Sequence, residues 1–101
     1  MAITCDPVKR ARALRERQLD FMDAAQVFDS DDTATFEDDR FAYGEIRFIT
    51  AGRLAGRMVL IVWTPRGADR HVISMRHCHA KEERKLIARF GLHGAKTVGR
   101  S

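Results

Sequence analysis

The feature that most constrains the fold is a run of three strand-like segments in the middle of the chain, separated only by short turns. These segments are residues 45–52, 58–64 and 70–77. The first and third alternate apolar and polar residues, whereas the second is nearly all apolar, as in a central strand buried on both faces. Segments 53–56 and 65–69 contain glycine and predict tight turns. Strands joined this closely pair antiparallel, so the pattern predicts a meander, with residues 33–37 as a fourth strand.

Helical patterns lie on both sides of the predicted meander. Asp6 followed by Pro7 is a typical helix start, with the aspartate as N-cap and the proline at the first helical position. Val8, Ala11 and Leu14 then recur every three residues. We expect these three side chains to form the buried face of a first helix.

A second helix is predicted from its N-cap Asp20 to Phe28, and a third over residues 80–90, with an apolar stripe that ends at Phe90. The predicted fold is α+β: two N-terminal helices, an antiparallel sheet of about four strands in a meander, and a C-terminal helix. We expect the helices to cover one face of the sheet and to leave the other free for a ligand. Residues 3–5 are a candidate short edge strand.

Length and composition bound the rest of the prediction. At 101 residues, the chain is expected to form one domain over residues 1–90, followed by a flexible tail over residues 91–101. Cys5 and Cys78 form no CxxC pair and the first residues show no signal sequence, so we expect a reduced, soluble, cytoplasmic protein. The longest apolar run, residues 58–63, is far shorter than the roughly 20 residues that span a bilayer, so no membrane contact is predicted.

The net charge of +4 hides a strong segregation along the chain. Residues 1–18 carry five basic and two acidic side chains, residues 19–45 one basic and nine acidic, and residues 46–101 twelve basic and three acidic. A sheet half this positive is typical of nucleic-acid-binding proteins. Solubility alone is the simpler explanation of a charge surplus, but the segregation favours an anionic ligand.

Most of the candidate chemistry lies between residues 69 and 84, where the last predicted strand leads into the last helix. Three of the four histidines, one cysteine and three arginines lie there: His71, His77, His79, Cys78, Arg70, Arg76 and Arg84. Strand alternation places Arg70, Val72, Ser74 and Arg76 on one face, and His71, Ile73, Met75 and His77 on the other. His77-Cys78-His79 lacks a second Cys or His pair at ligand spacing, so no metal site is predicted. His71 is interpreted as a surface residue.

Several motifs follow one another in a fixed order along the chain. They are Asp6 to Lys9, Asp20-Phe21, Ala24-Ala25, Val27-Phe28-Asp29, Asp38-Asp39-Arg40, Tyr43-Gly44-Glu45 with Arg47, Gly52, Arg57, Val62-Trp63-Thr64 with Arg66, Val72 to Arg76, and Glu82. In this order and spacing the chain resembles the BrnT family of type II toxins, small ribonucleases with a RelE-like fold. The resemblance runs from about Asp6 to the last helix.

The resemblance implies a metal-independent endoribonuclease that needs no cofactor and inhibits translation when it is free. It also implies a protein partner, a BrnA-like ribbon-helix-helix antitoxin, and contact with operator DNA only through the toxin–antitoxin complex. The chain departs from the family at Glu16-Arg17-Gln18, Ala13, Cys78, and Leu86 or Ile87. These departures leave open a second function, a catalytically inactive module of the same fold that binds the antitoxin and serves operon control.

RNA cleavage of this type begins with attack of the 2′-hydroxyl on the adjacent phosphate, and needs a base, an acid and cations. We expect Arg76, Arg70 and Arg47 to hold the phosphate, because guanidinium matches phosphate oxygens and stays charged. Glu45 and one of His77 or His79 are the candidates for proton transfer. The predicted RNA-binding residues are Arg17, Arg66, Lys81 and Arg84.

Other interpretations of the same residues remain open. Arg47 and Arg76 have ion pairs to Glu45 and Glu82 as an equally good explanation, and Glu82 and Glu83 are better explained as helix-start residues. Four aromatic residues are candidates for stacking on RNA bases, although Trp63 is better explained as core. They are Phe36, Phe41, Tyr43 and Trp63.

Overall fold

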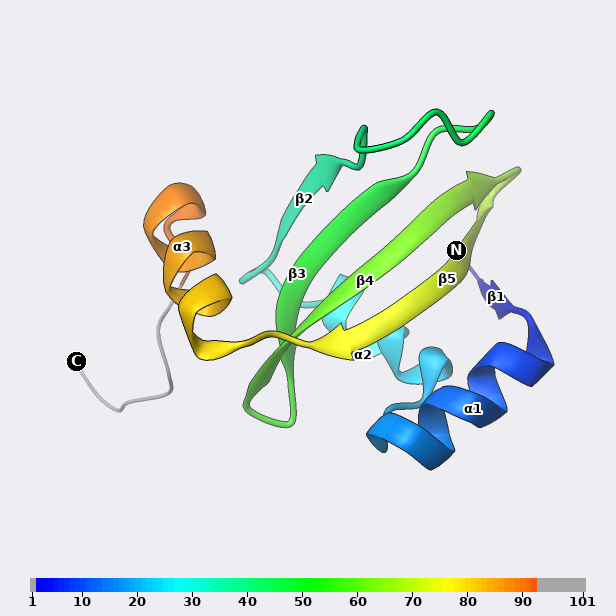
Figure 1. The fold of residues 1–101 in the computed structure, drawn as a ribbon, viewed down its shortest axis with the longest axis horizontal. Helices are drawn as coiled ribbons and strands as arrows, with labels where there is room; N and C mark the ends of the chain where they lie inside the picture. Colours follow the sequence, from blue (N-terminus) through cyan, green and yellow to red (C-terminus); the bar gives the residue numbers. More distant parts are fainter. Residues whose placement is uncertain (1, 93–101) are drawn as a thin grey trace.

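A computed structural model of the chain describes residues 2–92, which form a five-stranded sheet with helices packed on both faces (Figure 1). The strands lie in the order β1-β5-β4-β3-β2. The elements are β1 (Ile3–Cys5), α1 (Pro7–Arg17), a 3₁₀ turn η1 (Phe21–Asp23), α2 (Ala24–Phe28), β2 (Ala34–Glu37), β3 (Phe48–Leu54), β4 (Arg57–Arg66), β5 (Asp69–His77) and α3 (Ala80–Phe90). The fold is therefore α+β, as predicted.

The predicted meander is confirmed, since β2, β3, β4 and β5 pair antiparallel with their neighbours. The turn between β3 and β4 contains Ala55 and Gly56, both with positive φ (52° and 82°), which matches the twist of a two-residue hairpin. The predicted start of β3 at residue 45 is wrong, because the strand begins at Phe48. Residues 45–47 belong to the loop over residues 38–47.

The sheet has one more strand than the predicted four, and it is not wholly antiparallel. β1 pairs parallel with β5, with Ile3 opposite Arg70 and Cys5 opposite Val72. The backbone N–H of Arg70 also donates a 2.9 Å hydrogen bond to the carbonyl of Ala2. This pairing joins segments far apart in the sequence, so neither turn signals nor local periodicity indicate it.

The helices do not all lie on one face of the sheet, which corrects the prediction. α1, η1 and α2 pack on one face, where Val59, Ile61, Trp63 and Met75 meet Val27 and other helix residues. α3 packs on the opposite face, over a second cluster of Ala34, Ala51, Met58, Leu60 and Leu92. Figure 1 shows α3 well separated from α1 and α2. We call the two faces the α1/α2 face and the α3 face.

The first two helices differ from their predicted form. Asp6 and Asp20 do cap them, accepting 2.9 Å and 3.0 Å hydrogen bonds from the N–H groups of Val8 and Met22. The predicted buried face of α1 is wrong, because Val8 is 76% exposed and Leu14 is 43% exposed. Instead Ala13, near the middle of α1, is the buried residue of this helix and joins the core cluster on the α1/α2 face.

The second predicted helix is a 3₁₀ turn followed by the five-residue α2. Gly52 on β3 allows α2 to approach the sheet closely, because a Cβ at this position would lie 2.6 Å from a methyl carbon of Val27. The third predicted helix, residues 80–90, is confirmed with both its boundaries.

A β-bulge in β5 changes which side chains share a face. Val62 of β4 lies opposite Ser74, but the next residue, Trp63, lies opposite Val72, so Ile73 is an extra residue in β5. An extra residue reverses the alternation on one side of the bulge. Val72 therefore joins Met75 on the α1/α2 face, and the prediction that Arg70 and Arg76 share one face is wrong.

Residues 93–101, which include most of the predicted flexible tail, lie outside the described residues. Leu92, at the start of that predicted tail, is buried beneath α3. In the part of the chain that the structure describes, no helix has the length and apolar character needed to cross a membrane.

Candidate functional site

Arg76 lies near the end of β5 and points towards the start of α3. Its Nη1 and Nη2 donate 2.9 Å and 2.8 Å hydrogen bonds to the two carboxylate oxygens of Glu82. Glu82 also accepts a 3.2 Å hydrogen bond from the backbone N–H of His79, at the N-terminus of α3. The paired guanidinium lowers the pKa of Glu82 to about 2. The carboxylate therefore stays ionised at neutral pH and fixes the orientation of the Arg76 guanidinium. The guanidinium has further N–H groups that can donate to a ligand.

A small cavity of about 100 Å³ opens beside Arg76 on the α3 face. Its floor is apolar, and its polar groups are two guanidiniums and one hydroxyl. The lining residues are Arg40, Ile49, Leu60, Val62, Ser74 and Arg76. Two cations at the rim of an apolar pocket suit a small anionic group such as a phosphate. The sequence did not single out Arg40 as a site residue, although it was the one basic residue of the acidic segment over residues 19–45.

A second, more open depression of about 410 Å³ lies on the other side of Arg76, at the edge of β5. Its lining combines three arginines with two imidazoles, and the lining residues are Glu16, Arg17, Gln18, Arg57, Arg76, His77 and His79. Arg17 reaches this edge from α1, and its Nη1 donates a 3.0 Å hydrogen bond to the carbonyl of Met75. The structure thus brings Arg17, His77 and His79 together with Arg76.

His77 differs from an ordinary surface histidine. Burial, together with the neighbouring positive charge of Arg57, lowers the pKa of His77. Its imidazole is therefore neutral at pH 7 and able to accept a proton. His79 is exposed at the N-cap of α3, where its backbone N–H donates a 3.2 Å hydrogen bond to the Glu82 side chain.

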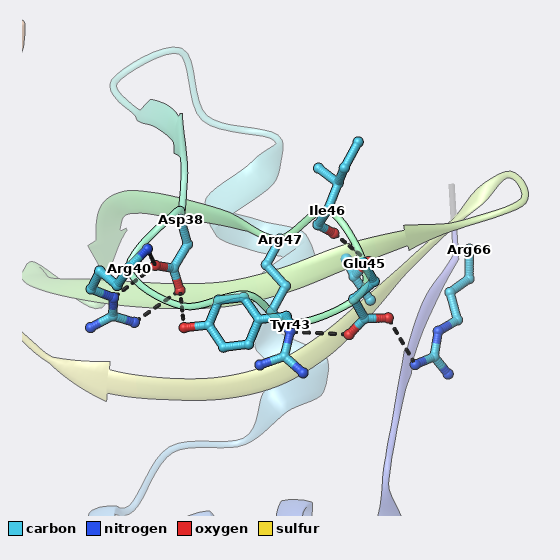
Figure 2. A network of polar contacts seen from close by, with 8 residues as sticks. Asp38, Arg40, Tyr43, Glu45, Ile46, Arg47 and Arg66 are labelled. Atoms are coloured by element: carbon cyan, nitrogen blue, oxygen red, sulfur yellow. Dashed lines mark hydrogen bonds and ion pairs between the residues drawn. The ribbon is translucent and has the colours of Figure 1, made fainter.

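The loop over residues 38–47 crosses the α3 face and is fixed by Asp38 (Figure 2). The Asp38 side chain is fully buried, and it accepts hydrogen bonds of 2.7 Å and 2.9 Å from Arg40 and one of 3.1 Å from the Tyr43 hydroxyl. Chiefly because of Arg40, the pKa of Asp38 is lowered to about 2. Its backbone N–H also donates a 2.8 Å bond to the Arg47 carbonyl, which closes the loop.

A second ion-pair group lies at the far end of the same loop. Glu45 accepts a 3.0 Å hydrogen bond from Nε of Arg47 and lies 3.8 Å from Nη2 of Arg66, as Figure 2 shows. The Arg47 guanidinium lies 3.9 Å from the centroid of the Tyr43 ring. Four arginines therefore follow one another across the α3 face, and we call them the arginine band: Arg40, Arg47, Arg66 and Arg76.

The band is too long for its members to act on one phosphate. Arg76 pairs with Leu60, and Arg66 lies six residues further along β4, which is about 20 Å at roughly 3.3 Å per residue. Glu45, which contacts Arg66, therefore lies at the opposite end of the band from Arg76. The structure does not bring Glu45 and Arg47 to Arg76, contrary to the expectation of a single clamp.

Arg70 lies on the α1/α2 face, away from the arginine band. Its guanidinium lies 4.2 Å from the ring centroid of Phe28 and 5.3 Å from that of Trp63. Its Nε is buried and has no hydrogen-bond partner among the described residues. These contacts make Arg70 part of the packing between α2 and the sheet.

The remaining candidates have mostly structural surroundings. Trp63 is core, and its Nε1–H donates a 2.9 Å hydrogen bond to Thr50. Phe36 stacks on Phe90 of α3, with ring centroids 5.4 Å apart. His71 shares a 2.8 Å hydrogen bond with the hydroxyl of Thr4, and burial lowers its pKa. Burial raises the pKa of Cys78 to about 11, which leaves a neutral thiol.

Lys81 and Arg84 are exposed on α3. Among residues 2–92, no three His, Cys, Asp or Glu side chains are arranged to hold a metal ion. The ion pairs Arg47–Glu45 and Arg76–Glu82, which were the alternative explanation of these two arginines, are both present.

Comparison with known protein families gives one match. The family model described as the ribonuclease toxin BrnT of type II toxin–antitoxin systems matches residues 6–82. The match begins at the N-cap of α1, includes the whole sheet except β1, and ends at Glu82, so it contains every member of the arginine band. No curated protein matches the chain.

Proposed function

Since the chain belongs to the BrnT family of ribonuclease toxins of type II toxin–antitoxin systems, we propose that it is an active, metal-independent endoribonuclease that inhibits translation. We also propose that a BrnA-like ribbon-helix-helix antitoxin neutralises it. The observation that supports catalysis best is the position of Arg76, which borders both the apolar cavity with Arg40 and the depression with His77 and His79.

The proposed reaction uses this position to hold the scissile phosphate. Arg76 donates to its non-bridging oxygens from the depression that also contains His77 and His79, and stabilises the charge that grows on them in the transition state. The cavity between Arg40 and Arg76 binds the neighbouring phosphate of the strand. The neutral imidazole of His77 accepts the proton of the 2′-hydroxyl as the 2′-oxygen–phosphorus bond forms. The bond from phosphorus to the 5′-oxygen breaks, and the 5′-oxygen takes a proton from His79, which acts as the general acid. The products are a 2′,3′-cyclic phosphate and a 5′-hydroxyl.

Glu82 has a positioning role in this proposal. Its two hydrogen bonds to Arg76 and its bond to the His79 backbone tie the strand end to the helix start. The guanidinium is thereby oriented before substrate binds, which reduces the reorganisation needed in the transition state. Arg17, Arg66, Lys81 and Arg84 are proposed to contact the RNA outside the scissile phosphate.

The test is cleavage of RNA by the purified chain in the presence of EDTA, together with growth after induction in a host that lacks the antitoxin. The wild type is expected to cleave and to arrest growth, and Arg76→Ala is expected to lower cleavage about 10²- to 10³-fold. Arg12→Ala is the matched control, because it removes an arginine from an exposed ion pair with Glu16 on α1. Wild-type cleavage by Arg76→Ala would contradict the site, and activity that requires added Mg²⁺ would contradict metal independence.

The second candidate function is the catalytically inactive module that binds the antitoxin and serves operon control. It is favoured by the pairing of Arg47 and Arg76 with the chain's own carboxylates, and by Glu16-Arg17-Gln18 where the family often carries Lys-His-Gly. Normal growth at full expression of folded protein, with stable binding of a ribbon-helix-helix protein encoded beside it, would support this function over catalysis.

A further inference from the structure

We propose that the loop over residues 38–47 is a base-binding platform, on which Phe41 stacks on a nucleobase of single-stranded RNA whose phosphate lies between Arg40 and Arg76. This inference rests on the proposed function and deepens it, because it names the form of RNA that the site accepts and the residue that contacts a base.

The first observation is an aromatic ring exposed on a fixed loop. Phe41 is 68% exposed, although a phenyl ring of this size is normally buried. Its ring meets that of Tyr43 at 76° with centroids 5.7 Å apart, and the Arg40 guanidinium lies 6.0 Å from its centroid. These contacts hold the ring in place while most of its surface remains open to a ligand.

The second observation is that the loop is held at both ends and in its middle. The buried Asp38 binds Arg40 and Tyr43, its N–H binds the Arg47 carbonyl, and the Thr64 hydroxyl donates a 2.7 Å bond to the Ile46 carbonyl. Figure 2 shows the contacts of the Asp38 side chain with Arg40 and Tyr43 and the bond at the Ile46 carbonyl. A platform ordered in advance loses little conformational entropy when a base binds to it.

The third observation links the ring to the phosphate site. Arg40 directly precedes Phe41. Its guanidinium lies 6.0 Å from the centroid of the Phe41 ring, and Arg40 also lines the cavity beside Arg76. A nucleotide whose phosphate binds Arg40 and Arg76 therefore has Phe41 within reach of a neighbouring base. Arg47 and Arg66 continue the positive track for the strand beyond Tyr43.

These observations favour unpaired RNA over a duplex. In an A-form helix the bases stack on one another and pair, so none is available to an aromatic side chain, whereas single strands can place a base on such a ring. An exposed apolar residue on this loop is also compatible with protein docking. The two arginines that flank aromatic rings, Arg40 and Arg47, favour the nucleic acid, because both phosphate and a base π-face bind beside guanidinium.

The test is binding of the full-length chain to a short 2′-O-methyl oligoribonucleotide, which lacks the attacking hydroxyl and is not cleaved. Phe41→Ala is expected to weaken binding of the single strand about 5- to 100-fold, since stacking on one aromatic side chain has this effect on affinity. Phe41→Trp is expected to restore it. Ile46→Ala is the matched control, because Ile46 is 57% exposed on the same loop but carries no ring.

An oligonucleotide with an abasic position is expected to bind the wild type and Phe41→Ala equally when the missing base is the one that stacks. Equal binding of the intact strand by both proteins would overturn the inference. So would a Phe41→Ala variant that binds RNA normally but no longer binds the antitoxin, which would assign the loop to protein docking.

Failure of the inference is distinguishable from failure of the proposed function. If the wild type cleaves RNA and Phe41→Ala binds and cleaves equally well, only the platform is contradicted. If the wild type binds the single strand through Phe41 but does not cleave any RNA, the platform holds and catalysis is contradicted.

Discussion

Arg70 and Arg76 lie on the same strand, six residues apart, and their surroundings are opposite. Arg70 lies on the α1/α2 face, above the rings of Phe28 and Trp63. Arg76 is paired with Glu82 beside a cavity on the α3 face. The difference arises from one extra residue in β5, because an unbroken strand would place residues 70 and 76 on the same face. Arg70 is therefore available for packing, and Arg76 for a ligand.

The two faces of the sheet differ in the same way. On the α1/α2 face, a large apolar cluster packs the helices against the sheet. The Arg70 guanidinium packs beside this cluster, over the Phe28 and Trp63 rings. The α3 face has a smaller cluster under α3, and its other half is covered by the loop over residues 38–47. That loop is held by charged hydrogen bonds and not by apolar burial. The α1/α2 face therefore contributes most of the apolar burial that stabilises the fold. The α3 face presents charged side chains to solvent.

The largest expected effect separates the two arginines by activity. Arg76→Lys keeps the charge but loses the planar fork, so we expect single-turnover RNA cleavage to fall about 10²-fold or more. Arg70→Lys is expected to cleave at the wild-type rate, because Arg70 lies on the other face. Equal losses of cleavage in the two variants, with both proteins folded, would contradict the assignment of catalysis to Arg76 and of packing to Arg70.

The next effect tests how the loop on the α3 face is held. Asp38→Asn removes the charged acceptor of Arg40, and we expect the free energy of unfolding at pH 7 to fall by about 1–3 kcal/mol. The neighbouring Asp39→Asn changes an exposed residue and is the control. Urea unfolding followed by circular dichroism measures both.

The same carboxylate gives this face a dependence on pH. The pKa of Asp38 is about 2 in the folded protein, below its ordinary value of 3.8, so its stabilising effect is present above about pH 4 and is lost as pH falls towards 2. The difference in stability between the wild type and Asp38→Asn should therefore shrink over this range. A difference that stays constant down to pH 2 would contradict the role of the ionised carboxylate.

A smaller effect is expected on the α1/α2 face. Arg70→Ala should lower the free energy of unfolding by about 1–2 kcal/mol, because a partly desolvated cation over two rings contributes this much. In a Phe28→Leu background the same substitution should have a smaller effect, which a double-mutant cycle in urea measures. For comparison, Arg76→Ala should change stability by only about 0–1 kcal/mol, since its ion pair is partly exposed. A larger loss of stability in Arg76→Ala than in Arg70→Ala would contradict the structural role of Arg70.

The smallest effect concerns the outer surface of α1. Val8→Ser should change stability by less than about 0.5 kcal/mol, because Val8 is largely exposed. Val27→Ala, on the fully buried side of α2, should lower it by roughly 1.5–2 kcal/mol or more. Differential scanning calorimetry of the two variants compares them directly, and a large loss for Val8→Ser would mean that α1 packs on its other side.

Much of the fold was accessible from the sequence because it depends on local signals. The apolar run of β4 and its glycine turns predicted the meander, and the caps Asp6 and Asp20 and the pattern of α3 placed helix boundaries correctly. The face of α1 was not accessible in this way. Its three-residue spacing indicated the face with Val8, Ala11 and Leu14, whereas contact with the sheet buries Ala13, whose neighbours one turn away along the helix are charged.

The candidate site was partly accessible for the same reason. Arg76, His77 and His79 are neighbours in sequence, so they remain close in any fold, and the structure adds Arg17 to them. Arg40 was missed, because an arginine within an acidic segment gives no sign that its loop will fold over the α3 face. Glu45 was expected beside Arg76 because both lie in motifs that resemble the BrnT family, whereas the antiparallel register of β3, β4 and β5 places them at opposite ends of the band.

The sequence by itself determined most of the secondary structure, the order of the elements of the meander and the family of this protein, because periodicity, caps and motifs act over a few residues. Only the tertiary structure decided which arginines meet. The bulge at Ile73 placed Arg70 and Arg76 on opposite faces, the parallel addition of β1 joined residues far apart in the chain, and the buried Asp38 brought Arg40 to the cavity. The bulge and the β1 pairing depend on contacts between distant segments, and such contacts leave no repeating pattern in the chain. The Asp38–Arg40 contact is local, but the place of its loop over the sheet is not.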